Sequence, residues 1–209
     1  MYIPKFNSIA DRAILLEAMR TYSFAILFGP LDGTIGAAPH HGTHLPLVVK
    51  DEGPYGILEG HFAKANLHWQ ALAGRETLVV FPGPHSYVSP SLYAEQFSVP
   101  TWNYIAIHAY GVLESVDEND DAANEALLYN LIQANEPAYA EQWRTLPDGF
   151  RRTMLSGITG FRIEITRIEG KFKISQNRPQ VDRLAVQSAQ ASGTDDQRAL
   201  ADWMKRLIG

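Results

Sequence analysis

Residues 77–113 read TLVVFPGPHSYVSPSLYAEQFSVPTWNYIAIHAYGVL and contain one formally charged side chain, Glu95, in a chain that is 20% charged. A stretch so poor in charge is expected to lie mostly inside the folded protein. It is also rich in neutral hydrogen-bonding side chains: His85, Ser86, Tyr87, Ser89, Ser91, Tyr93, Thr101, Trp102, Asn103, Tyr104, His108 and Tyr110. Burying such groups without partners costs roughly 1–3 kcal/mol each, so they must bond to one another or face a polar ligand.

The composition limits the classes of protein to consider. The 209 residues suffice for one domain with a sizeable core, and the net charge of −5 argues against a main role in sequence-independent binding of nucleic acid. There is no cysteine, which excludes disulfides and thiolate metal sites and fits a reducing compartment. The first residues do not resemble a signal peptide, and no stretch of eighteen apolar residues occurs. We therefore expect a soluble, cytoplasmic protein with no membrane partner.

Short β-leaning runs dominate the first third of the chain. They are SFAILFG (23–29), TIGAAP (34–39), THLPLVV (43–49) and YGILEGHF (55–62), and segments of turn composition separate them. This spacing predicts an antiparallel meander. Helical patterns stand around it, at residues 8–20 with Ser8 as the cap, near 120–134, and after Pro137 and Pro147. The pattern predicts a mainly β protein with peripheral helices, in the α+β class.

The last third predicts two strands and a helix. Residues 160–176, GFRIEITRIEGKFKISQ, alternate apolar and polar side chains, and Glu169–Gly170 is a plausible two-residue turn of a hairpin. The stretch QSAQASGTDD (187–196) has the polarity of a linker. Thr194 and Gln197 then form a candidate capping box for a C-terminal helix with one apolar face.

All seven histidines lie between positions 40 and 108: His40, His41, His44, His61, His68, His85 and His108. Imidazole is a common metal ligand, but HExxH is absent and no carboxylate recurs beside the histidines at ligand spacing. The pattern favours hydrogen bonding at a cofactor or in a buried strand, and no metal site is predicted.

Cations gather near the C-terminal strands. Between positions 151 and 178 seven Lys and Arg stand against Glu164 and Glu169: Arg151, Arg152, Arg162, Arg167, Lys171, Lys173 and Arg178. They would suit a phosphate group, and a solvated strand face is the alternative explanation. Residues 59–66, EGHFAKAN, place further donors after a strand. No Walker A, GxGxxG or GxSxG motif is present, so neither a common nucleotide fold nor a nucleophilic triad is indicated.

Five segments taken together carry a resemblance: THLPLVV (43–49), GHFAKAN (60–66), FPGPHSYVSPSLY (81–93), VPTWNYIAIHAYG (99–111) and GFRIEITRIEGKFKISQNR (160–178). In this order they closely resemble the PaiB family of FMN-binding negative transcriptional regulators. The resemblance covers roughly residues 1–183. It implies a flavin-binding split barrel, similar to the pyridoxamine-phosphate oxidases, that works as a homodimer with FMN at the subunit interface.

The resemblance also implies a set of FMN-binding residues: Thr43, His44, His61, Lys64, Asn66, Asn103, Lys173, Gln176, Asn177 and Arg178. In it Lys64, with Lys173 or Arg178, would meet the flavin phosphate. Gln176 and Asn177 would reach across the dimer. No catalytic acid or base can be assigned, because in flavin enzymes the cofactor carries the chemistry.

The expected organisation is a split-barrel domain over residues 1–183 with inserted helices at about 118–156, followed by a linker and an amphipathic helix over 184–209. Three functions remain open at this point. The leading one is an FMN-binding regulator with or without flavin oxidoreductase activity. The others are a repressor that binds DNA directly, which neither charge nor motif supports, and a haem-binding or haem-degrading split barrel, which the histidines suggest.

Overall fold

A computed structural model describes residues 1–30, 40–117 and 120–209 of the chain. The expected run TIGAAP and the first two residues of the expected helical insertion lie outside this part. The described residues form two compact units, each made of several chain segments. Unit 1 comprises Met1–Leu15, Pro82–Ile107 and Glu169–Gly209, and unit 2 comprises Leu16–Phe81 and His108–Ile168.

The described residues contain nine strands in one sheet, whose order is β3-β2-β6-β7-β8-β5-β4, with β9 paired to β7 and β1. The strands are β1 (Ser8–Ile9), β2 (Phe24–Pro30), β3 (His40–Pro46), β4 (Val48–Lys50), β5 (Ile57–Ala63), β6 (Glu76–Val88), β7 (Thr101–Ser115), β8 (Ile158–Glu164) and β9 (Arg167–Lys173). Every strand pair with a defined register is antiparallel. The predicted antiparallel α+β class is confirmed.

Most of residues 77–113 belongs to β6 and β7, the two longest strands described. In β7 every second residue from Asn103 to Leu113 is buried, as the period of two in a strand requires. In β6 the buried positions are odd-numbered up to Phe81 and even-numbered from Pro84 onward. The alternation therefore shifts by one residue within Pro82-Gly83-Pro84. Gly83 lies there against Ile105, and a Cβ at Gly83 would come within 2.9 Å of the Ile105 backbone oxygen.

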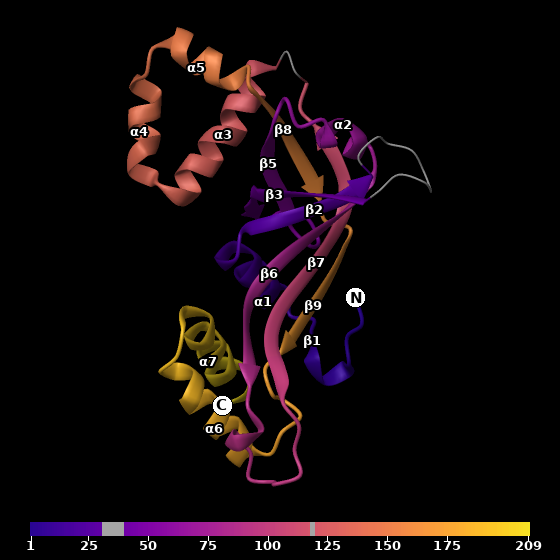
Figure 1. Cartoon of the computed structure of the whole chain (residues 1–209). Helices are drawn as coiled ribbons and strands as arrows, with labels where there is room; N and C mark the ends of the chain where they lie inside the picture. The colour runs from indigo at the N-terminus through magenta and orange to yellow at the C-terminus, as the bar shows by residue number, and fades with distance from the viewer. Residues whose placement is uncertain (31–39, 118–119) are drawn as a thin grey trace. The chain divides into compact units, whose positions relative to one another are not determined.

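Unit 2 is built on two sets of paired strands. In one set β2 pairs with β3 and with the first part of β6, and in the other β5 pairs with β4 and β8. The helix α2 (His68–Leu72) follows β5, and three further helices, α3 (Asp121–Asn135), α4 (Pro137–Thr145) and α5 (Asp148–Leu155), succeed one another before β8 (Figure 1). Asp120 caps α3 by accepting a hydrogen bond from Ala123 N at 2.9 Å.

Unit 1 holds β1, most of β9, the second part of β6, the first part of β7 and two helices, α6 (Gln180–Ala191) and α7 (Asp195–Ile208), which pack side by side (Figure 1). Two short 3₁₀ helices, η1 (Lys5–Asn7) and η2 (Pro90–Leu92), belong to the same unit. The predicted capping box of Thr194 and Gln197 is formed. Trp203 of α7 packs its ring edge-on against Phe172 of β9, with the ring centroids 5.1 Å apart.

Three local predictions are wrong. Helix α1 (Arg12–Thr21) starts after Ser8, which lies in β1, and Asp11 Oδ1 accepts from Ala13 N at 2.9 Å near its start. Glu169–Gly170 is no turn but part of β9, and β8 and β9 each pair with β7 rather than with each other. Gly170 serves packing instead, because a Cβ there would lie 2.2 Å from Leu15 Cδ2.

The third wrong prediction is the linker. Residues 187–191 are the last turns of α6, and only three residues separate α6 from α7. The polar composition of this stretch suggested a linker, but the face that α6 buries is itself partly polar: its buried positions are Asp182, Val186 and Gln190. Their spacing of four is that of a helix face, although two of the three side chains are polar.

Candidate functional site

The ten predicted FMN-binding residues divide evenly between the units. Five lie in unit 2: Thr43, His44, His61, Lys64 and Asn66. Five lie in unit 1: Asn103, Lys173, Gln176, Asn177 and Arg178. Each group is described within its own unit.

Thr43, Asn66 and His68 form a hydrogen-bonded cluster in unit 2. A hydrogen bond of 2.8 Å joins Thr43 Oγ1 in β3 to His68 Nδ1 at the start of α2. Asn66 Nδ2 donates to Thr43 Oγ1 at 3.3 Å, and Asn66 Oδ1 accepts from His68 N at 3.1 Å. These hydrogen bonds tie the turn between β5 and α2 to strand β3. Two of the predicted residues, Thr43 and Asn66, therefore belong to one network.

His68, which the sequence reasoning did not select as a site residue, is the centre of this cluster. Its side chain is fully buried, and the ring of His41 meets it edge-on at a centroid distance of 4.9 Å. Burial lowers the pKa of His68, and the neighbouring His41 lowers this pKa further. His68 is therefore a neutral imidazole at physiological pH. The clustering of histidines in the sequence was the available signal, but it did not single out this ring.

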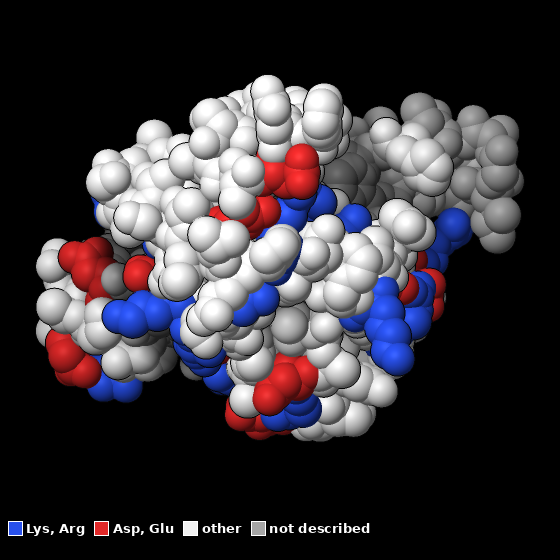
Figure 2. Space-filling model, turned by 90° about the horizontal axis from the view of Figure 1, so that it is seen from below, with Lys and Arg blue, Asp and Glu red and all other residues white. Residues whose placement is uncertain are grey.

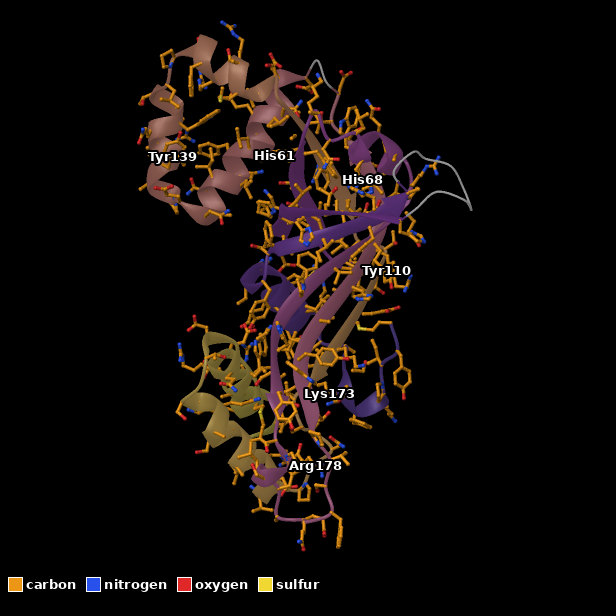
Figure 3. The ribbon with its side chains drawn as sticks, in the orientation of Figure 1. His61, His68, Tyr110, Tyr139, Lys173 and Arg178 are labelled. Carbon is orange, nitrogen blue, oxygen red and sulfur yellow. The ribbon has the colours of Figure 1, made fainter. Side chains whose placement is uncertain are left out.

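The other predicted residues of unit 2 lie along β3 and β5. The ring of His44 stacks on that of Phe24 at a centroid distance of 6.1 Å. His61 stands opposite Gly160 of β8, and burial lowers its pKa. Lys64 is held by its backbone, because its N–H donates to Gly157 O at 2.8 Å and its carbonyl accepts from Trp69 Nε1 at 3.3 Å. Figure 3 labels His61 and His68 on their elements.

Unit 1 contains a cavity of about 600 Å³. Its lining comprises Tyr2, Pro4, Phe6, Asn7, Tyr93, Val99, Pro100, Thr101, Trp102, Asn103, Tyr104, Lys171, Lys173, Ser175, Asn177 and Arg178. Four of the five predicted residues of this unit therefore share one cavity. Aromatic rings and cations make up much of its wall, and Figure 3 labels Lys173 and Arg178 near the end of β9.

Gln176, the fifth predicted residue, shapes the turn beside the cavity. Its side chain accepts from Ile174 N at 2.8 Å and donates to Phe172 O, so it links the end of β9 to the turn that follows. Ser175 has a left-handed backbone with φ of 67°, which is uncommon for a residue other than glycine. Asn103 Nδ2 donates to Ser175 Oγ at 3.0 Å, and both side chains are buried. Asn103 thus positions this turn.

Three cations reach the cavity wall, and each has neutral partners. Lys171 Nζ donates to Tyr2 O at 3.0 Å. Lys173 Nζ donates to Thr101 Oγ1 and to Trp102 O, each at 2.5 Å. The Arg178 guanidinium lies 3.9 Å from the centroid of the Tyr93 ring. Sequence reasoning counted Lys171 in the basic group but not in the site, although Lys171 and Lys173 are two apart on β9 and so share a strand face.

In the described part of the chain, no group of three or more His, Cys, Asp or Glu side chains is arranged to hold a metal ion. Over the same part of the chain, none of the helices has both the length and the apolar character needed to cross a membrane.

Comparison with known proteins gives a family and a fold. Residues 1–167 match the family described as "Putative FMN-binding domain". The protease synthase and sporulation protein PAI 2 of Bacillus subtilis (strain 168) is 33% identical to this chain over 187 residues, which cover 89% of this chain and 87% of that protein.

Two solved structures share the fold at low identity. The flavocytochrome Anf3 from Azotobacter vinelandii has a TM-score of 0.60 and 14% identity, covering 82% of this chain and 72% of its own. The FAD and heme binding protein from Mycobacterium smegmatis has a TM-score of 0.59 and 14% identity, covering 90% of this chain and 81% of its own. At this identity the two structures establish the fold alone.

Proposed function

This chain belongs to the PaiB family of flavin split-barrel proteins, and from that premise we propose that it binds FMN. The observation that carries the proposal is the match of residues 1–167 to the FMN-binding domain. Six of the ten predicted FMN-binding residues fall within this span: Thr43, His44, His61, Lys64, Asn66 and Asn103.

The predicted FMN-binding residues include side chains whose chemistry suits the ring edge and the phosphate of FMN. A flavin needs neutral hydrogen-bonding groups at its ring edge, an apolar slot for the ring, and cations for the phosphate. Thr43, Asn66 and Asn103 are assigned to hydrogen bonds at the edge of the flavin ring. Lys64 is assigned to the phosphate. Bound FMN would supply electron and hydride transfer, while the residues of the chain bind and orient it.

The first experiment measures FMN binding and its dependence on the phosphate. Titration of the purified protein should quench flavin fluorescence, and Lys64→Ala should weaken FMN by about tenfold while weakening riboflavin less, because a charge-assisted hydrogen bond contributes at that level. Lys205→Ala, which removes an exposed lysine of α7, is the matched control. Failure to bind at high micromolar FMN would refute cofactor binding, and equal losses for FMN and riboflavin would show that Lys64 does not hold the phosphate.

A homodimer forms part of the proposal. Its support is the resemblance to split-barrel proteins, in which the flavin lies at the subunit interface, and Gln176 and Asn177 are the residues proposed to reach the partner's flavin. Light scattering coupled to size-exclusion chromatography tests the assembly. A monomer that binds FMN with full affinity would separate the cofactor claim from the dimer claim.

Flavin redox activity and haem binding are tested on the same sample. Reduction by NADH or NADPH, followed at the visible flavin band, tests oxidoreductase activity. A Soret band on addition of haem would favour the haem alternative.

If the protein is a regulator, the distribution of charge supports regulation without direct contact with DNA. The chain carries a net charge of −5, and on the face shown in Figure 2 groups of Lys and Arg alternate with Asp and Glu. DNA binding through phosphates requires clustered cations and gives a strong dependence on salt. A filter-binding assay that finds salt-sensitive affinity for DNA would overturn the proposal that regulation involves no direct DNA contact. The cytoplasmic location stays a prediction for cell fractionation to test.

A further inference from the structure

A second cavity, of about 460 Å³, is lined by residues of unit 2. The end of α1, strand β4 with the residue before it, and the end of α3 form its walls. Arg20 is the one charged residue among the described residues that line it. None of the ten predicted FMN-binding residues is in this lining, so the cavity is separate from the residues assigned to FMN.

Arg20, near the end of α1, is anchored by one hydrogen bond. Its Nε donates to Val49 O at 3.1 Å. In the described part of the chain the other N–H groups of this guanidinium have no acceptor, and no carboxylate forms an ion pair with it. The two terminal nitrogens of a guanidinium suit the two oxygens of a carboxylate. Arg20 is therefore held in place with its carboxylate-binding donors unused.

Val49 adds a backbone donor on the same side of β4. Leu47 N donates to Ser23 O at 3.0 Å, so the backbone of Leu47 faces the residues that follow α1. Along an extended strand every second residue presents its N–H and C=O to the same edge, and the bond from Arg20 to Val49 O agrees with this. Val49 N–H therefore points to the edge of β4 that β5 does not occupy, and no described residue accepts from it there.

The end of α3 supplies acceptors. The last carbonyls of a helix have no N–H partner within the helix, and the residues after α3 do not provide one. Pro137 has no N–H to donate to Gln133 O. Tyr139 N donates to Glu136 O at 3.0 Å and not to Asn135 O. Because the last turn of α3 also has no basic residue, this helix end keeps its partial negative charge.

Two residues of this helix end, Ala134 and Asn135, line the cavity. Asn135 Nδ2 donates back to Leu131 O at 2.8 Å, which leaves Asn135 Oδ1 as a further acceptor. The cavity thus combines a positive group, Arg20, with the negative end of a helix. A ligand with only a carboxylate would be repelled by the helix end, and a ligand with only an ammonium would be repelled by Arg20. A molecule that carries both groups suits both sides.

We propose that this cavity binds a small zwitterionic amino acid, with its carboxylate on Arg20 and Val49 N–H and its ammonium on the carbonyls at the end of α3. The carbon chain of the ligand lies against the apolar side chains of Leu47, Val48 and Val49. A volume of about 460 Å³ is in the range of small-molecule sites. This site goes beyond the proposed binding of FMN and takes no part in it.

The test titrates two zwitterions into the purified full chain by isothermal titration calorimetry. They are L-leucine, with adjacent charges, and 6-aminohexanoate, with separated charges. The half molecules 4-methylpentanoate and hexanoate lack the ammonium, and isopentylamine and hexylamine lack the carboxylate. We expect at least one zwitterion to bind about tenfold or more tightly than either of its half molecules, because a hydrogen bond to a charged group contributes at that level.

Two substitutions at exposed positions locate the site. Arg20→Gln removes the charge and should weaken binding of the zwitterion by about tenfold or more. Ala134→Leu keeps the charge of Arg20 and the backbone groups but adds bulk to the cavity wall, so it should also weaken binding. Arg12→Gln, at the other end of α1 and outside the lining, is the matched control and should leave the affinity unchanged. Circular dichroism verifies that each variant is folded.

Two results would overturn the proposal. One is that neither zwitterion binds more tightly than its half molecules. The other is an affinity that neither Arg20→Gln nor Ala134→Leu changes, because binding would then occur elsewhere on the protein. Since no residue of this lining is assigned to FMN, failure of FMN binding would leave this test intact.

Discussion

Replacing Thr43 by valine tests the hydrogen-bonded cluster of unit 2. The change removes Oγ1 while keeping a branched side chain of similar size, so His68 Nδ1 and Asn66 Nδ2 lose their shared partner. His68 is fully buried and cannot turn to water, and leaving such a group unsatisfied costs about 1–3 kcal/mol. Asn66 is only half-buried and adds little. We expect Thr43→Val to lower the free energy of unfolding by about 2 kcal/mol.

Urea unfolding followed by circular dichroism measures this loss. For a slope of about 2 kcal/mol per molar urea, the midpoint should fall by about 1 M. Thr159→Val is the matched control, because Thr159 is also buried in a strand but its Oγ1 has no hydrogen-bond partner in the described part of the chain. Its replacement should leave stability unchanged or raise it. Equal effects of the two substitutions would refute the reasoning, because the hydroxyl of Thr43 would then contribute nothing specific.

Two further predictions concern packing and pH. Gly111→Ala would place a Cβ 2.1 Å from the Glu164 backbone oxygen, so we expect a loss of about 3 kcal/mol in a thermal melt, whereas Gly149→Ala, with nothing within 4 Å, should be neutral or stabilising. Burial lowers the pKa of His61 in the folded protein, so the unfolded chain binds a proton at His61 more readily. The free energy of unfolding should therefore fall as the pH drops below the ordinary histidine pKa of about 6.5, and it should continue to fall down to the lower pKa of the folded state. His61→Gln should reduce this slope in urea titrations at several pH values, and an unchanged slope would contradict the assignment.

Much of the fold could be predicted from the sequence because its signals are local. Alternation in β7 and β8 and the capping box of α7 each depend on neighbouring residues. That β8 and β9 each pair with β7, and not with each other, could not be predicted in this way. A Glu–Gly pair is a plausible hairpin turn, but Gly170 is required by the approach of Leu15, which is 155 positions away in the sequence.

The candidate site shows the same division. The resemblance selected Asn103, Lys173, Asn177 and Arg178, and these line one cavity. It did not select Lys171 or Tyr93, which line the same cavity. Nor could spacing reveal that His68, rather than His61, is the fully buried imidazole of unit 2. Such features arise from tertiary packing and leave little trace in a single sequence.

The one-residue shift of alternation in β6 sets a parity rule for changes of length. Buried Phe81 and buried Pro84 are three positions apart instead of two, so removing one residue between them would restore strict alternation and leave Ser86 and Val88 buried. Removing two would make Phe81 and Pro84 neighbours and turn one of the two buried sets of β6 outward. Natural relatives that are one residue shorter at this point should therefore keep both buried sets of β6.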